Sequence, residues 1–393
     1  MEGSLGFLFL TFLIIPLPHF FIFCTGHTHS QVRCIDTERR ALLTFKQDLI
    51  DPSNRLSSWT VDGDCCHWVG VVCHNLTAHV HQLHLRSFPP VWDDSMTLEQ
   101  YEEAYWRSRF GGPIPVDLQN MTSLRHLDLS GNNFNSSIPN WLYSFSRLEF
   151  LNLGSNNLQG TISSAIGNLT SAISIDLSVN ELGGKLPRSL GNLCNLREIR
   201  LSSNKWSQEI SEILESLSGC LSDRLEILDL SDSQLHGHLP DELGVFKNLV
   251  QLSFQDNSIS GPIPVSFGNL SSLTYLDFSN NQFNGTLPQN FGHLKNLVKL
   301  YFQQNSISGP IPVSFGNLSS LTYLDFSNNH INGSLPQNFG QLKNLADLNL
   351  WNNSISGPLP VSFGNLSSLT YLDFSNNQFN GTLPQNFGQL SKL

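Results

Sequence analysis

The residues best suited to chemistry in this sequence are tyrosines, carboxylates and a tryptophan that recur at regular spacing. The stretch FGNLSSLTYLDFSNN occurs three times, and every copy contains a tyrosine followed two residues later by an aspartate. Tyrosine and tryptophan offer large rigid contacts with a polar group, which suits a protein or peptide surface. The carboxylates recur at one position of each repeat, whereas an enzyme typically has a single pair of carboxylates with shifted pKa values. This pattern therefore argues against an active site. The expected ligand-binding residues are Gln251, Tyr275, Asp277, Lys299, Tyr301, Tyr323, Asp325, Asp347, Asn349, Trp351, Tyr371 and Asp373.

A repeat of 24 residues must position these side chains. The pattern LxxLxLxxNxLxGxIPxxLxxLxx begins at Leu124 and occurs eleven times in all, and only the repeat Leu196 to Arg224 is longer, at 29 residues. Positions 1, 4 and 6 alternate like one face of a strand, so each repeat is expected to begin with a strand whose apolar side chains point inward. Position 9 is nearly always asparagine, whose amide can satisfy backbone groups at a turn.

No single repeat can bury its apolar residues alone, so the sequence predicts stacked coils with a parallel sheet along one concave side. The outward positions 2, 3, 5, 7 and 8 of the strands carry the expected binding residues. The alternative interpretation is that LDLS and LDFS are the ordinary strand sequence of this repeat, and that recent duplication explains why the copies are identical.

Composition and length limit the classes of partner. The 393 residues carry a net charge of −11, and 13% of them are charged. The sequence has no run of Lys or Arg that could bind along a phosphate backbone, which argues against nucleic acid as a partner. No catalytic or phosphate-binding motif is present, and no metal or cofactor site is expected. The expected segments are a secretory signal at 1–26, a cap at 27–78, a first repeat at 79–123 and eleven repeats at 124–393. An uncleaved membrane anchor is the alternative to the signal.

Six cysteines remain after the signal, and an even number in an exported chain indicates disulfides. The alternative for the group Cys65, Cys66, His67, Cys73 and His74 is a zinc site. Cys194 and Cys220 lie just before successive strands, which predicts a disulfide across the stretched repeat, with two buried free thiols as the alternative.

The glycosylation sequons avoid the strand positions, with one exception. They stand at Asn75, Asn120, Asn135, Asn168, Asn269, Asn284, Asn317, Asn332, Asn352, Asn365 and Asn380. Sugars at these sites would cover the flanks and leave the concave side bare, except that Asn352 lies at its rim. The alternative is that the sequons occur only because the repeat consensus contains Asn-x-Ser/Thr, and that any glycans are incidental.

Two features interrupt the pattern near the start. Between Leu85 and Phe110 the first repeat carries 20 extra residues rich in acidic and aromatic types. Long loops of this kind are usually functional or disordered. His79, His81 and His84 have no carboxylate partner in their stretch, so solvated side chains are expected there.

The repeat resembles the plant class of leucine-rich repeats, with its LxGxIPxxLGNLxxL signature, over about 80–393. The stretch from Cys34 to Cys73, which contains DTERRALLTFKQDLIDPSNRLSSW and CCHWVGVVC, is similar to the N-terminal cap of plant receptor-like proteins of the xylanase-receptor and disease-resistance type. The resemblance implies an α/β leucine-rich repeat solenoid, a curved right-handed superhelix with a helical, disulfide-bonded cap. In the cap, Thr37 is expected to cap a helix that buries Leu42, Phe45 and Leu49.

The same resemblance implies more detail about the N-terminal end. It pairs Cys34 with Cys65 and Cys66 with Cys73, places Trp59 and Trp68 over the first repeat, and makes the 20-residue insertion a packed island.

The expected function is recognition of a protein or peptide ligand outside the cell, in the apoplast, without enzymatic activity. The resemblance implies a role in plant defence with a co-receptor kinase, and a plasma-membrane location if the full gene adds a membrane helix. The alternatives are a secreted inhibitor of a microbial cell-wall-degrading enzyme, similar to polygalacturonase-inhibiting proteins, and a nonfunctional receptor fragment. The sequence looks truncated after Leu393, and Leu369, Leu372, Phe374 and Phe379 are expected to be exposed on the last coil.

Overall fold

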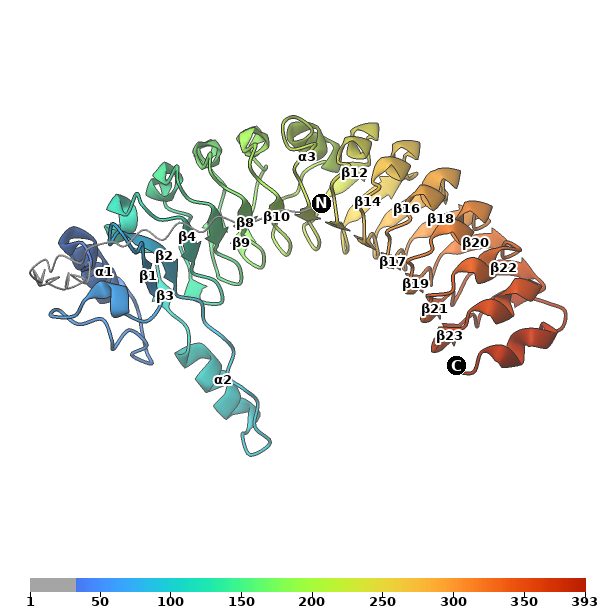
Figure 1. Cartoon of the computed structure of the whole chain (residues 1–393), viewed down its shortest axis with the longest axis horizontal. Coiled ribbons are helices and arrows are strands. Elements are labelled where there is room, and N and C mark those ends of the chain that lie inside the picture. The colour runs from blue at the N-terminus through green and yellow to red at the C-terminus, as the bar shows by residue number, and fades with distance from the viewer. Residues whose placement is uncertain (1–32) are drawn as a thin grey trace, which may run out of the picture. The chain divides into compact units, whose positions relative to one another are not determined.

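The computed structural model describes residues 33–393, so the expected signal at 1–26 lies outside the described residues. Arg33–Leu393 form one compact unit of stacked coils. The coils of this unit follow an arc, with the strands of the larger sheet along its inner side and the short helices along its outer side (Figure 1). The fold is the expected leucine-rich repeat solenoid with parallel strands on the concave face.

The concave sheet has 13 strands, and each repeat contributes one of them. Only β1 and β2 pair antiparallel, in the cap and first repeat, and all later pairs are parallel and in register. The strands are β1 (Val71–Cys73), β2 (Val80–His84), β4 (His126–Asp128), β6 (Phe150–Asn152), β8 (Ser174–Asp176), β10 (Glu198–Arg200), β11 (Ile227–Asp229), β13 (Gln251–Ser253), β15 (Tyr275–Asp277), β17 (Lys299–Tyr301), β19 (Tyr323–Asp325), β21 (Asp347–Asn349) and β23 (Tyr371–Asp373).

The later coils form a second sheet of seven strands, to which each coil contributes one strand after the turn that ends its concave strand. Its strands are β12 (His236–His238), β14 (Ser258–Gly261), β16 (Gln282–Thr286), β18 (Ser306–Gly309), β20 (His330–Gly333), β22 (Ser354–Gly357) and β24 (Gln378–Phe379). Earlier coils form the shorter pairs β3 (Gly111–Gly112) with β5 (Asn133–Phe134), and β7 (Gln159–Gly160) with β9 (Glu181–Leu182). Glycine ends several of these strands, such as β14 and β18, because the chain adopts positive φ there, +82° at Gly261 and +75° at Gly309.

Helices occupy the outer side and the two irregular regions. The α-helices are α1 (Asp36–Asp48), α2 (Leu98–Arg107) and α3 (Ile210–Leu217). The 3₁₀ helices are η1 (Cys65–His67), η2 (Val116–Asn120), η3 (Asn140–Ser144), η4 (Ser164–Asn168), η5 (Arg188–Asn192), η6 (Asp241–Val245), η7 (Val265–Asn269), η8 (Gln289–His293), η9 (Val313–Asn317), η10 (Phe339–Gln341), η11 (Val361–Asn365) and η12 (Gln385–Gln389). Across 33–393, every helix is too short or too polar to cross a bilayer.

The coils share one continuous apolar interior. Position 6 places Phe254, Phe278, Phe302 and Phe326 in successive coils with no exposed surface, and the first two rings stack with their centroids 5.2 Å apart. Burial of each such side chain contributes about 1.5–3 kcal/mol, and most of this is available only when a neighbouring coil covers it.

The last coil is better covered than its sequence suggested. Leu369 has no exposed surface, because it packs against the preceding coil, so the expectation of exposure was wrong for this residue. Leu372, Phe374 and Phe379 are half-buried and pack against the core on one side.

Buried asparagines at position 9 connect neighbouring coils. In a typical case, Asn305 Nδ2 donates to Phe302 O of its own coil at 3.1 Å and to Phe278 O of the previous coil at 2.9 Å, while its Oδ1 accepts from Phe283 N at 3.0 Å. We call the residues that repeat these bonds the asparagine ladder, which consists of Asn132, Asn156, Asn180, Asn204, Asn257, Asn281, Asn305, Asn329, Asn353 and Asn377. The ladder satisfies backbone groups that the turns leave without a strand partner.

The coil after the stretched repeat Leu196 to Arg224 departs from the ladder. Position 9 of this coil is Ser233, whose hydroxyl is 3.5 Å from Leu201 O, and the indole N–H of the buried Trp206 donates to that carbonyl at 2.8 Å instead. The five extra residues of the stretched repeat accompany the α-helix α3, which replaces a 3₁₀ turn. A disulfide joins Cys194 to Cys220 beside it, as the spacing had indicated.

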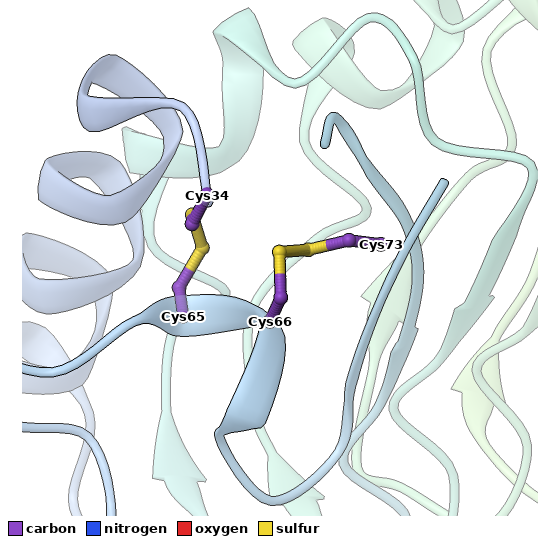
Figure 2. A group of neighbouring side chains, drawn as sticks. All are labelled: Cys34, Cys65, Cys66 and Cys73. Carbon is purple, nitrogen blue, oxygen red and sulfur yellow. A yellow bond between two sulfur atoms is a disulfide. The ribbon is translucent and has the colours of Figure 1, made fainter. Parts of the chain in front are cut away.

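The cap is held by two disulfides. Cys34 pairs with Cys65 and Cys66 pairs with Cys73, as the family resemblance implied, and Figure 2 shows the two bridges side by side. The four sulfurs are therefore not free thiolates, which removes the zinc alternative for this group.

Helix α1 buries the expected apolar face but begins two residues earlier than expected, at Asp36 rather than Glu38. Leu42 and Phe45 have no exposed surface and Leu49 is buried. The expectation that Thr37 caps the helix was wrong, because the residue before the helix is Ile35, which makes no side-chain cap, and Thr37 lies inside the first turn.

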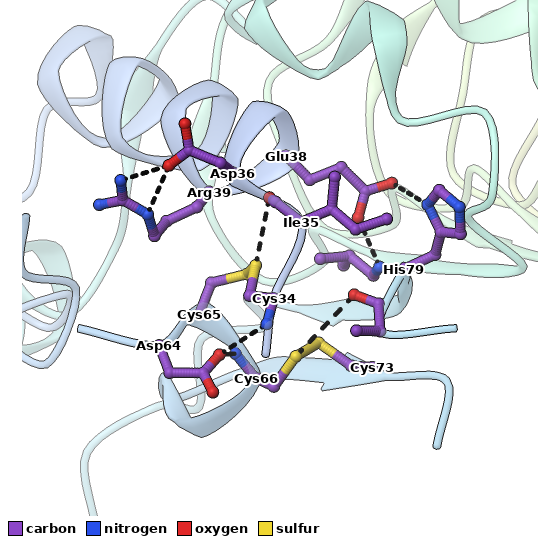
Figure 3. The surroundings of a disulfide bond; sticks show 12 residues. Cys34, Ile35, Asp36, Glu38, Arg39, Asp64, Cys65, Cys66, Cys73 and His79 are labelled. Atoms are coloured by element: carbon purple, nitrogen blue, oxygen red, sulfur yellow. Dashed lines mark hydrogen bonds and ion pairs between the residues drawn. A yellow bond between two sulfur atoms is a disulfide. The ribbon is translucent and has the colours of Figure 1, made fainter. Parts of the chain in front are cut away.

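A buried glutamate links the cap to the first repeat, and an aspartate bonds within the cap, neither of which the sequence revealed (Figure 3). Glu38 accepts from Val80 N at 2.7 Å and contacts His79 Nδ1 at 2.9 Å. Asp64 Oδ1 accepts from the backbone N–H groups of Cys34 and Cys66. The bonds of Glu38 fix the start of β2 relative to α1, and those of Asp64 hold Cys34 and Cys66 in place.

We expect Asn305→Ala to lower the free energy of unfolding by about 2–4 kcal/mol, because it leaves buried N–H and C=O groups of two coils unpaired. Chemical denaturation followed by circular dichroism measures the change. Ser306→Ala is the matched control, since this neighbouring side chain is exposed. Equal stability of the two variants would contradict a structural role for the ladder.

Candidate functional site

The concave sheet arranges the expected binding residues in continuous rows. Parallel pairing in register sets Tyr275 opposite Gln251 and Lys299, and sets Tyr301 opposite Asp277 and Asp325. One row contains Gln251, Tyr275, Lys299, Tyr323, Asp347 and Tyr371, and the adjacent row contains Asp277, Tyr301, Asp325, Asn349 and Asp373. Trp351 follows β21 at position 7 and lies outside both rows.

The aspartates of these rows have a structural role on one oxygen. Asp277 Oδ1 accepts from Ser279 N at 3.0 Å and from Ser279 Oγ at 2.6 Å, which fixes the turn after the strand. The same backbone bond recurs at Asp128, Asp176, Asp229, Asp325 and Asp373. Asp277 and Asp325 are only 5% and 7% exposed, less than their outward position suggests, because tyrosines of the neighbouring strands cover them.

Three tyrosines form a contiguous aromatic group at the centre of the rows. The ring centroids of Tyr275 and Tyr301 are 5.6 Å apart and those of Tyr301 and Tyr323 are 4.6 Å apart. All three rings are half-buried, and we call them the tyrosine cluster. Tyr371 lies two strands further along and is 49% exposed, so it stands apart from the cluster.

Burial and the nearby carboxylates keep the cluster in its neutral form. Burial, with added repulsion from Asp325, raises the pKa of Tyr323 to about 12, and the pKa values of Tyr275 and Tyr301 are raised for the same reasons. Burial also raises the pKa of the Asp277 carboxyl above its usual value, although the bonds from Ser279 oppose this. The hydroxyls therefore remain hydrogen-bond donors at neutral pH, and Tyr275 Oη donates to Asp277 Oδ2 at 3.2 Å.

Polar side chains surround the cluster. Gln251 and Lys299 are exposed beside it, and Asn349 Nδ2 donates to Asp325 Oδ2 at 3.2 Å. Trp351 is half-buried, and its ring stacks on no other aromatic ring among residues 33–393. The surface thus combines flat aromatic contact with fixed donors and acceptors, which suits an extended chain lying across the strands.

The sequon asparagines are all exposed. Asn269, Asn317 and Asn365 end 3₁₀ helices on the outer side, whereas Asn284 and Asn332 lie on strands of the second sheet. Asn352 follows β21 with a φ of +55°, at the edge of the concave face.

The 20-residue insertion does not form the packed island that was expected. It contains α2, which begins with a capping box formed by Thr97 and Gln100 and buries none of its residues. Only its base is fixed: Ser108 O accepts from Arg55 Nη1 at 2.9 Å and from Ser87 Oγ at 2.8 Å. The helix extends away from the coils because its aromatic side chains contact one another rather than the core (Figure 1).

A pocket of about 340 Å³ lies between the base of the insertion and the first concave strands. Its lining includes Arg86, Tyr105, Arg109, Ser130 and Asp176. The sequence analysis missed this pocket because the lining residues come from several coils and from the irregular loop.

The sequence matches leucine-rich repeat families along most of the described unit. The leucine rich repeat N-terminal domain matches 35–74. Leucine rich repeat families match 279–331 and 295–355, and also 123–145, 147–169, 224–246, 248–270 and 368–390.

Individual relatives are plant receptors. Receptor-like protein EIX2 of Solanum lycopersicum is 34% identical over 113 residues, which cover 29% of this chain and 10% of that protein. The solved structure of the plant peptide hormone receptor RGFR1 in complex with RGF2 is 33% identical, with a TM-score of 0.72 over 84% of this chain and 51% of that one. The Arabidopsis receptor kinase HAESA in complex with the peptide hormone IDA and the co-receptor SERK1 is 28% identical, with a TM-score of 0.64 over 91% of this chain and 69% of that one.

This chain is a leucine-rich repeat protein homologous to plant receptor-like proteins. Its matches cover about a tenth of EIX2 and about half of RGFR1.

We expect Asp277→Asn to raise the free energy of unfolding at pH 7, because the amide is uncharged where the buried carboxylate is ionised. The pKa of Asp277 is raised in the folded state, so its stabilising effect is present below the unfolded pKa and is lost as pH rises through the folded pKa. An amide avoids this loss and keeps the turn, because Asn152 Oδ1 and Asn349 Oδ1 accept the same backbone bond. Denaturation at pH 4 and pH 7 measures the difference.

Asp373→Asn, at the same position on the last strand and less buried, is the control. A variant Asp277→Asn that is less stable than wild type at pH 7 would contradict this account.

Proposed function

We propose that this chain is the extracellular, non-enzymatic recognition module of a receptor-like protein and that its concave face binds a protein or peptide ligand. The observation that carries the proposal is the tyrosine cluster, in which three half-buried rings meet across β15, β17 and β19. Rings held in this way give large contact areas without much loss of side-chain freedom on binding.

The charges around the cluster favour a ligand with basic groups. The two rows contain four aspartates and one basic residue, Lys299. The aspartates are Asp277, Asp325, Asp347 and Asp373. Asp277 and Asp325 each have one oxygen engaged by a serine, and the other is directed to neighbours on the concave face. A peptide with a lysine or arginine beside an apolar residue would complement the rings and the more exposed carboxylates of Asp347 and Asp373.

The positions of the glycosylation sequons also favour the concave face as the binding surface. Glycans on the outer helices and on the second sheet would leave the concave sheet accessible, because these asparagines lie away from its strands. A glycan at Asn352 would border Trp351 and limit the ligand at that end.

The finer role is part of the same proposal and rests on the family resemblance. RGFR1 and HAESA were solved with peptide ligands, and HAESA also with the co-receptor SERK1. We place this chain in the apoplast, or at the plasma membrane if the full gene encodes a membrane helix, with a role in plant defence. Signalling would pass through a partner kinase, as the resemblance to receptor-like proteins implies.

The double substitution Tyr301→Ala with Tyr323→Ala is expected to weaken ligand binding at least about 30-fold, because it removes the centre of the aromatic surface. The glycosylated chain, immobilised, retrieves ligands from apoplastic fluid, and biolayer interferometry then measures the affinity of the recovered ligand for each variant.

Val265→Ala with Val313→Ala is the control, because these side chains are exposed on the outer 3₁₀ helices. Unchanged affinity of the tyrosine variant, or an equal loss in the control, would place the binding surface elsewhere.

A further inference from the structure

Two histidines and an aspartate converge at the start of the concave sheet. β2 and β4 pair in register, so His84 lies opposite Asp128, and Gln82 lies opposite His126. One ring nitrogen from each histidine and one carboxylate oxygen all lie within 4.8 Å of one another. The three side chains are half-buried and therefore accessible from the concave side.

Neighbouring groups already orient this trio. Asp128 Oδ1 accepts from Ser130 N at 3.0 Å and from Ser130 Oγ at 2.6 Å, which leaves Oδ2 for a further partner. A ring nitrogen of His84, Nε2, lies 2.9 Å from Gln82 Oε1. Outer contacts of this kind hold the ligands of metal sites in position.

The surroundings are apolar on one side. The rings of His84 and His126 have centroids 4.4 Å apart, and His126 stacks on Phe150 at 5.4 Å. Two arginines lie near these strands: Arg86 packs its guanidinium over Phe88 at 5.0 Å, and Arg125, next to His126, pairs with Glu149. The carboxylate of Asp128 forms no ion pair with either of them and lies beside the imidazoles.

We propose that His84, His126 and Asp128 bind a divalent transition metal such as Zn²⁺, with its open position toward the concave space. Two imidazole nitrogens and a carboxylate oxygen form a donor set that zinc accepts, with bonds of about 2.0–2.2 Å. Tetrahedral geometry brings ligand atoms to about 3.3 Å from one another, so the three groups close inward by rotation of partly exposed side chains. The fourth position takes water or a donor group from a bound ligand.

This site is separate from the tyrosine cluster. Six strand steps lie between β4 and β15, or roughly 29 Å at the spacing of neighbouring strands. Metal binding here therefore does not depend on the proposed recognition of a peptide, and either can fail without the other.

The test is titration of the glycosylated chain, prepared without a polyhistidine tag, with Zn²⁺ in a calorimeter and no other ligand. Wild type is expected to bind one zinc ion per chain, and His126→Gln and Asp128→Asn are each expected to weaken this binding at least about tenfold. Asp128→Asn should keep the fold, because Asn152 Oδ1 accepts the equivalent bond from Gly154 N at 2.9 Å. Equal melting temperatures of the metal-free variants check this.

His81→Gln is the matched control, since His81 lies on the same strand but outside the trio. Substitution with Co²⁺ gives a second measurement, because four-coordinate cobalt shows strong visible absorption that both ligand variants should lose. Zinc binding that is absent in wild type, unchanged in both ligand variants, or lost equally in His81→Gln would overturn the proposal.

Discussion

The structure depends on one constraint, which is that each turn leaves backbone groups that only a side chain can satisfy. A buried asparagine amide meets this need with donors and an acceptor, and it bonds to two coils at once, as Asn281 does with Phe254 O and Phe278 O. The cost of leaving such groups unpaired in an apolar interior makes the asparagine almost obligatory. Because the same amide bonds to adjacent coils, it also fixes their register, and the hydrophobic residues can then fill one shared interior.

Fixed register makes the concave face a surface with predictable rows. The inward side chains are nearly invariant along the array, whereas the outward ones differ between alternate strands, so the surface can change without disturbing the interior. Local bonds from serine to aspartate add rigidity at the end of each strand, and they tolerate asparagine, as Asn152 and Asn349 show. Burial raises the pKa of the Asp277 carboxyl, although the hydrogen bonds from Ser279 and Tyr275 oppose this, and we interpret the raised pKa as a stability cost of burying a carboxylate in this row.

Much of the fold could be predicted from the sequence because its determinants are local and repeated. The strands, the buried columns, the asparagine positions and the link between Cys194 and Cys220 all follow from a fixed period. The start of α1 could not be predicted, since the disulfide and Asp64 fix the chain near Cys34 and leave Thr37 no capping role. The sequence did not predict that α2 would be exposed. It also did not predict that His84 lies beside the next coil, because the 20-residue insertion separates in sequence two residues that lie on adjacent strands. The binding residues themselves stay a prediction, because position in a row does not identify a ligand.

Hydrogen exchange of the folded, glycosylated chain tests the central claim most directly. If asparagine amides hold the coils together, the backbone N–H groups of Phe283, Ile307 and Ile331, which donate to them, should exchange slowly and at similar rates in successive coils. The amides of Val265 and Val313, at the exposed start of outer 3₁₀ helices, should exchange far faster. Equally fast exchange at both sets of amides would contradict the account.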